Sequence, residues 1–110
     1  MHIAKVTNKD GSIEIYFTGV GHWDDFDLIL GLLQQENNCQ ILSNREMIYI
    51  REAKLICGNI EFELIQDDML GNFICPKNPG DIQTLEQLAA NVINSIIEKI
   101  AQKNNSIPKP

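Results

Sequence analysis

Two segments near the N-terminus alternate between apolar and polar residues with the two-residue period of β-strands. We expect strands over residues 2–7 and 12–18, joined by a turn at residues 8–11 in which Gly11 adopts a positive φ. The residues on the packed face of the second strand are large and apolar: Ile13, Ile15 and Phe17.

A helical period replaces this alternation in the next segment. Asp24 suits a helix N-cap, and Asp25 and Asp27 fall in the first turn, where the helix dipole favours negative charge. The apolar positions recur at intervals of three and four: Phe26, Ile29, Leu30 and Leu33. We expect the helix to end near residues 37–38, and Gly31 within it would let a neighbouring element approach closely.

Between residues 39 and 75 the pattern is that of short strands separated by turns. The expected strands cover residues 39–42, 47–57, 60–64 and 73–75, and the expected turns lie at residues 43–44, 58–59 and 67–72. Short loops favour antiparallel pairing of all of these strands.

A wide apolar stripe then predicts a long helix, capped by Asp81 or Thr84. Its members are Leu85, Leu88, Ala89, Val92, Ile93, Ile96, Ile97 and Ile100. The pattern as a whole predicts one α+β domain over residues 1–103, followed by a frayed tail over residues 104–110. The expected fold is a single antiparallel β-sheet of five or six strands with two helices packed on one face, in the order ββαββββα.

The charge balance narrows the classes of partner. Fifteen Asp and Glu residues against nine Lys and Arg residues give the 110-residue chain a formal net charge of −6. This excess of acids disfavours nucleic acid as a partner and favours a basic one. We find neither a secretory signal nor an apolar run of the ~20 residues that a membrane span needs, so we expect a cytoplasmic protein without a membrane partner. The oligomeric state stays open.

Three cysteines, Cys39, Cys57 and Cys75, match neither a redox pair nor a zinc motif. We expect buried, unreactive thiols in a reducing compartment. A catalytic or metal-binding cysteine would need a partner base, and only His2 and His22 are available.

The densest polar cluster covers residues 22–27 and contains His22, Asp24, Asp25 and Asp27. Its acids suit a helix start and lack the pattern of a calcium loop, so we expect no metal. The preceding residues 19–21 resemble a phosphate-binding loop only weakly. Because the acids that follow would repel a phosphate, we expect no nucleotide or other cofactor.

A second acidic group follows one strand and the turn after it: Glu61, Glu63, Asp67 and Asp68. Such a patch would steer a basic partner toward the protein. Arg51 and Lys54, on the neighbouring strand of the same hairpin, could instead pair with some of these acids and cancel their charge.

In its size, acidity and order of elements, the chain resembles the immunity proteins of bacterial toxin systems, including those of contact-dependent growth inhibition. The resemblance implies a non-enzymatic inhibitor that binds a cognate basic toxin, such as a nuclease, through acidic groups and a few desolvated anchors. The expected anchors are Tyr16 and Trp23, and the expected charged contacts are the acids of the two groups above.

Two other classes of function remain open. A small acidic secretion chaperone would act as a dimer, although such proteins usually open with a helix and this chain opens with a hairpin. A small enzyme would use His22 or a cysteine as its reactive group.

Overall fold

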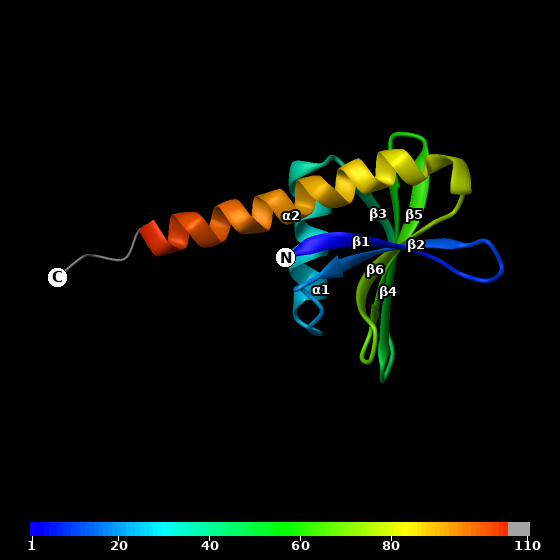
Figure 1. The fold of residues 1–110 in the computed structure, drawn as a ribbon, viewed down its shortest axis with the longest axis horizontal. Coiled ribbons are helices and arrows are strands. Elements are labelled where there is room, and N and C mark those ends of the chain that lie inside the picture. Colours follow the sequence, from blue (N-terminus) through cyan, green and yellow to red (C-terminus); the bar gives the residue numbers. More distant parts are fainter. Residues whose placement is uncertain (106–110) are drawn as a thin grey trace.

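Six strands and two α-helices follow one another in the expected order ββαββββα in the computed structural model, which describes residues 1–105. The strands are β1 (His2–Thr7), β2 (Ile13–Thr18), β3 (Gln40–Glu46), β4 (Ile50–Cys57), β5 (Ile60–Asp67) and β6 (Gly71–Pro76). The helices are α1 (Asp25–Glu36) and α2 (Ile82–Asn105), and the short 3-10 turn η1 (Pro79–Asp81) precedes α2 (Figure 1).

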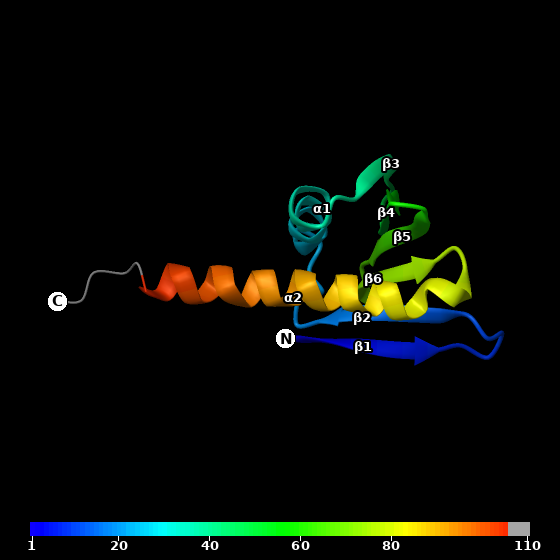
Figure 2. The same cartoon turned by 90° about the horizontal axis from the view of Figure 1, so that it is seen from above.

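The strands form one antiparallel sheet in the order β1-β2-β6-β5-β4-β3, which confirms the expected fold class. The sheet twists so strongly that β1 and β2 run across the direction of β4 and β5 (Figure 1). Both helices lie on the same side of it (Figure 2). There α1 packs against β5, while α2 packs against β1, β2 and β6.

A row of fully buried side chains crosses the middle of the sheet. Ile15, Ile74, Leu64 and Ala53 are successive cross-strand partners on β2, β6, β5 and β4, and each is 0% exposed. The helices cover this row with buried residues from their apolar stripes: Phe26, Ile29, Leu33, Leu85, Ala89 and Val92. Burial of each large aliphatic side chain stabilises the fold by about 1.5–3 kcal/mol.

The N-terminal hairpin confirms the expectation. β1 pairs with β2 from His2 opposite Thr18 to Thr7 opposite Ile13, and Gly11 has a φ of +87°. The turn is closed by a 2.8 Å hydrogen bond that the backbone N–H of Asn8 donates to the carbonyl of Ser12.

Helix α1 begins and ends where its pattern predicts, although its start is held differently. Asp24 occupies the N-cap position, but its side chain makes no capping hydrogen bond. Asp25 Oδ2 instead accepts a 3.0 Å hydrogen bond from the backbone N–H of His22. At the other end Asn37 is the C-cap and Asn38 has a φ of +58°, the left-handed conformation that asparagine tolerates.

The turn expected at residues 43–44 is wrong. Ser43 and Asn44 lie within β3 and pair with β4, and a change of register between Ile41 and Ser43 marks a β-bulge. The actual turn lies at residues 47–49, which were expected to form part of a strand because they are apolar. The residue types mislead in both places: the polar residues 43–44 pair with β4 in the sheet, and the apolar residues 47–49 form the turn.

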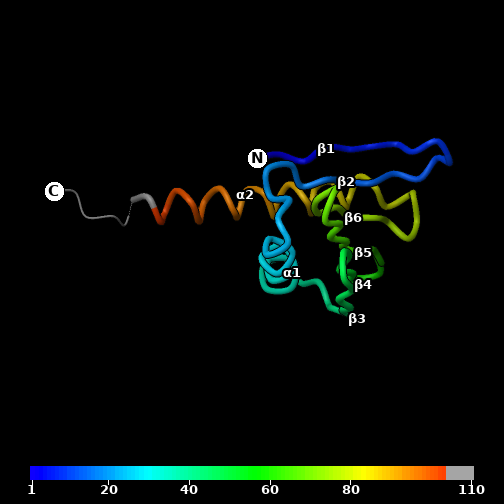
Figure 3. Tube along the Cα trace, turned by 90° about the horizontal axis from the view of Figure 1, so that it is seen from below, coloured from blue at the N-terminus to red at the C-terminus, as the bar shows by residue number. Residues whose placement is uncertain are grey.

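Helix α2 begins directly after Asp81, one of its two expected caps, while Thr84 lies inside the helix. Its final turns run past the sheet (Figure 3), where Ile97 and Ile100 are 45% and 46% exposed. The helix continues through Asn105, beyond the expected domain end at residue 103. Residues 106–110 of the expected tail lie outside the described part of the chain.

Two glycines differ in what a side chain would meet. A Cβ added at Gly31 would have no neighbouring atom within 4 Å, so the expected close approach at this glycine is wrong. Gly71 has a φ of +94°, and a Cβ there would lie 3.3 Å from the Cα of Gly21. Gly71 is therefore required both by its conformation and by a neighbouring backbone.

These environments predict opposite effects of alanine. Gly31→Ala should raise the free energy of unfolding by about 0.5–1 kcal/mol, because alanine favours the helix. Gly71→Ala should lower it by about 1–2 kcal/mol, because a left-handed conformation strains any residue with a Cβ. Urea denaturation measures both values, and destabilisation by Gly31→Ala would contradict the open surroundings of this glycine.

Candidate partner-binding site

Three segments that are distant in the sequence meet at one end of the sheet. They are the loop between β2 and α1 at residues 19–24, the β3–β4 turn at residues 47–49 and the β5–β6 turn at residues 68–70. The backbone N–H of Asp68 donates a 3.0 Å hydrogen bond to the carbonyl of Tyr49, which joins the two turns. We call the end of the molecule formed by these segments, the strand residues that flank them and the first turn of α1 the loop end.

Two buried amides attach the β2–α1 loop to the sheet. Gln66 Nε2 donates a 3.0 Å hydrogen bond to the carbonyl of Gly21, and Asn72 Nδ2 donates to the carbonyls of Val20 and His22 at 2.7 and 3.2 Å. Both amides are 1% exposed. Since a buried loop carbonyl without a partner is costly, these side chains fix where the loop lies.

Arg51 is the main electrostatic contact of this end. It is 9% exposed, and its Nη1 and Nη2 donate hydrogen bonds of 2.9 and 2.7 Å to the two carboxylate oxygens of Asp27. Its Nε lies 3.7 Å from a carboxylate oxygen of Glu46, and its guanidinium carbon lies 4.5 Å from the centre of the Phe26 ring. The hydrogen bond from Arg51 holds the pKa of Asp27 below its usual value.

The sequence had left open whether Arg51 pairs with the second acidic group. It does not, and the charge of that group is not neutralised by Arg51. It pairs with Asp27 instead and also donates a 3.4 Å hydrogen bond to the carbonyl of Trp23, whose ring lies 5.6 Å from the guanidinium. Trp23 and Asp27, both expected to bind a partner, are thus engaged within the chain, and their contacts with a partner stay predictions.

The remaining expected acids of the loop end differ in whether their carboxylates are already engaged by the chain itself. Asp67 Oδ1 accepts hydrogen bonds from the backbone N–H groups of Met69 and Leu70 at 2.8 and 3.1 Å, so it shapes the β5–β6 turn. Asp25 holds the helix start, as described above. Asp24 and Asp68 are exposed, and neither forms an ion pair within residues 1–105.

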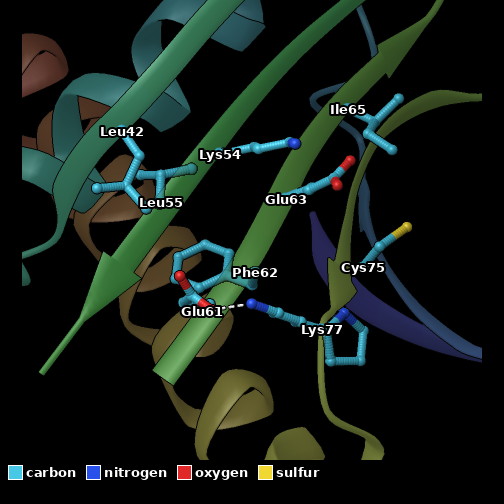
Figure 4. A pocket seen from close by; sticks show the side chains of 10 residues that line it. Leu42, Lys54, Leu55, Glu61, Phe62, Glu63, Ile65, Cys75 and Lys77 are labelled. Atoms are coloured by element: carbon cyan, nitrogen blue, oxygen red, sulfur yellow. Dashed lines mark hydrogen bonds and ion pairs between the residues drawn. The ribbon is translucent and has the colours of Figure 1, made fainter. Parts of the chain in front are cut away.

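Glu61 and Glu63 lie far from these acids, although all four members of the second acidic group are close in sequence. The six residues from Glu61 to Asp67 along β5 correspond to about 20 Å. Glu61 pairs with Lys77, and Lys54 is the cross-strand partner of Glu63 (Figure 4). These side chains line a hollow of about 390 Å³ on the face of the sheet away from the helices.

Tyr16, the other expected anchor, lies on that same open face. Its ring stacks on Phe73 with the ring centres 4.8 Å apart, and it is half-buried. Burial is the main cause that raises the pKa of its hydroxyl. Tyr16 thus packs on Phe73 within the sheet surface, where the charge of Asp67 is a smaller cause that also raises the pKa of its hydroxyl.

The net charge of the protein is concentrated at the loop end. Counted by side chains, six carboxylates lie there with one guanidinium, that of Arg51, which gives a formal charge of −5 out of −6 for the whole chain. The six are Asp24, Asp25, Asp27, Glu46, Asp67 and Asp68. All of them except Glu46 were expected from the sequence. Glu46 lies immediately before the β3–β4 turn. It could have been named from the sequence only if that turn had been predicted at residues 47–49.

The same end exposes apolar side chains that the sequence pattern did not indicate. The four most exposed large hydrophobic residues of the described chain all lie in the two turns: Met69 at 93%, Ile48 at 84%, Tyr49 at 69% and Leu70 at 60%. Met47, at 40%, adjoins them. We call these five residues the tip patch.

The thiols described by the structure are all free, and none forms a disulfide. Cys39 is buried and Cys75 half-buried, and desolvation raises the pKa of each to about 12. The hollow on the open face is lined by Cys75 but by neither histidine. Within residues 1–105 we find no group of three or more His, Cys, Asp or Glu side chains placed to hold a metal ion.

Comparison of the chain with protein-family models, curated proteins and solved structures finds no match. Neither helix of the described chain combines the length and apolar character required to cross a bilayer. The case for function therefore depends on the surface of the molecule.

Removal of Arg51 should destabilise the protein much more than removal of an exposed arginine. Arg51→Ala removes the two-point contact with Asp27 and uncovers Phe26. Because Asp27 and Glu46 are themselves exposed and stay hydrated, we expect a loss of about 1–2 kcal/mol in the free energy of unfolding. Arg45→Ala removes only an exposed pair with Glu52, and we expect a change below about 0.5 kcal/mol. Equal losses in urea denaturation would contradict the central role of Arg51.

The raised thiol pKa values predict slow alkylation of the folded protein. At pH 8, Cys39 and Cys75 should react with iodoacetamide about 1000-fold more slowly than in urea, because a pKa near 12 leaves almost no thiolate. Peptide mapping by mass spectrometry measures the rate at each site. Rapid labelling of either thiol in the folded protein would instead favour the alternative of a cysteine enzyme.

Proposed function

We propose that this protein binds and neutralises a basic protein domain, in the manner of an immunity protein that inhibits a cognate toxin such as a nuclease. The observation that carries the proposal is the concentration of charge at the loop end. A field of this kind accelerates the encounter with a positively charged partner and orients it. The protein acts by binding, in the cytoplasm, and performs no reaction of its own.

The arrangement of the loop end supports a binding role. Asp24 and Asp68 are exposed and have no ion pair within the described residues, so a partner can pair with both without breaking an ion pair. Arg51 and the amides of Gln66 and Asn72 hold the β2–α1 loop that carries Asp24. The turn that carries Asp68 is joined to the β3–β4 turn by the hydrogen bond from the N–H of Asp68 to the carbonyl of Tyr49. A surface ordered before binding loses less conformational entropy when the complex forms.

Two matched double variants test which carboxylates matter. Asp24→Asn with Asp68→Asn removes two charges from the loop end, while Glu61→Gln with Glu63→Gln removes two from the half of β5 that lies away from it. We expect the first variant to bind the partner about 10- to 30-fold more weakly and the second to bind like the wild type. The wild-type affinity should fall as the salt concentration rises.

The partner is identified by capture from the cells that encode the protein, with wild type and both variants as baits. It should be retained by the wild type and the Glu61/Glu63 variant and depleted from the Asp24/Asp68 variant. Expressed alone, the partner should arrest growth, and co-expression of the wild type should restore it. Equal capture by all baits would contradict binding at the loop end, and a harmless partner would contradict the inhibitory role.

A further inference from the structure

We propose that the tip patch is an apolar anchor within the acidic loop end, and that the surface it fits is a protein pocket with an apolar floor bordered by Lys and Arg. This inference depends on the proposed function, because it names the kind of partner surface that the same end recognises. The uncharged residues of the tip patch would then contribute part of the binding energy, in addition to the acids.

The exposure of these side chains has no explanation within the fold. Hairpin turns are normally polar, yet residues 47–49 are Met-Ile-Tyr and residues 69–70 are Met-Leu. Solvent-exposed apolar groups that adjoin one another on a monomer are typical of interaction surfaces. Tyrosine and methionine are also enriched where proteins bind each other.

A backbone hydrogen bond joins the two turns side by side. The N–H of Met47 donates a 2.7 Å hydrogen bond to the carbonyl of Ile50, which closes the first turn. The second turn is closed by the carboxylate of Asp67, and the contact between Asp68 and Tyr49 joins the two. The side chains are therefore presented by a fixed scaffold, which is how binding anchors lower the entropy cost of association.

Acids border the apolar groups directly. Glu46 precedes the first turn, and Asp67 and Asp68 precede Met69 in the second. An apolar centre with a charged rim is the usual anatomy of a protein interface, in which the rim selects the partner and the centre supplies most of the affinity. The complementary surface has an apolar centre and a basic rim.

The same charges argue against two other occupants. A symmetric dimer through this patch would place the loop-end carboxylates of one copy against the identical carboxylates of the other. Nucleic acid and anionic lipid would be repelled by a formal charge of −5 at this end. A protein surface with basic and apolar groups complements both the acids of the loop end and its exposed apolar side chains.

The test uses two seven-residue peptides of equal charge, each with four Lys separated by either Leu or Gly. We expect the Leu peptide to bind the wild type about tenfold more tightly than the Gly peptide, with NMR shift changes at residues 46–51 and 67–71. Ile48→Ser with Met69→Ser should remove this tenfold preference and leave weak, salt-sensitive binding of both peptides.

The control is Ile97→Ser with Ile100→Ser, which removes two exposed isoleucines from α2 and should leave the preference intact. Circular dichroism verifies that both variants stay folded, as expected for side chains so exposed. Equal binding of the two peptides to the wild type would overturn the anchor while leaving the acidic site standing. Failure of both peptides to bind, or binding of both away from the loop end, would overturn the proposed function as well.

Discussion

The loop end depends on one buried guanidinium. Arg51 lies on the inward face of β4, where its neighbours along the strand are core residues, and its charge would be costly there without a partner. Asp27 provides a two-point carboxylate contact from α1, and Phe26 provides an aromatic face. Because these contacts tie the start of α1 to β4, they also place the preceding loop beside the two turns.

The uneven charge of the molecule arises from pairing as much as from composition. Elsewhere in the described chain several acids have a basic partner: Glu86 with Lys5, Glu52 with Arg45, Glu61 with Lys77 and Glu36 with Lys99. At the loop end Arg51 is the one Lys or Arg side chain of the described residues among six acids; it is directed inward and pairs with Asp27 and Glu46. Although the net charge of the chain is modest, the unpaired acids produce a strong negative field at the loop end. A count of charged residues along the chain does not reveal this.

Strict alternation and helical periodicity predicted most of the fold correctly, because these patterns report directly on which face of an element is buried. The N-terminal hairpin and both helices followed from such patterns. The boundaries of β3 and β4 did not, since Ser43 and Asn44 are typical of turns and Met47 to Tyr49 are typical of strands. There, pairing with a neighbouring strand outweighs local preference.

The candidate site was only partly predictable for a related reason. Its acids could be named, because charge is visible in a sequence. Their grouping could not, because Arg51 meets Asp27 across 24 residues and the buried amides reach loops 45 to 52 residues away. The tip patch was missed because exposure in a turn is a property of the assembled sheet. Hydropathy assigned Met47, Ile48 and Tyr49 to a strand, while Met69 and Leu70 were placed in a turn without any indication that they would adjoin the other three.

The β-bulge in β3 has a consequence for the whole surface. β3 is an outermost strand, and a straight one with free backbone groups would invite further strands to add to it. The bulge between Ile41 and Ser43 breaks that regular ladder, and the charged residues Arg45 and Glu46 discourage close stacking of another chain. The β3 edge is thus less suited to adding further strands, while the nearby tip patch stays exposed.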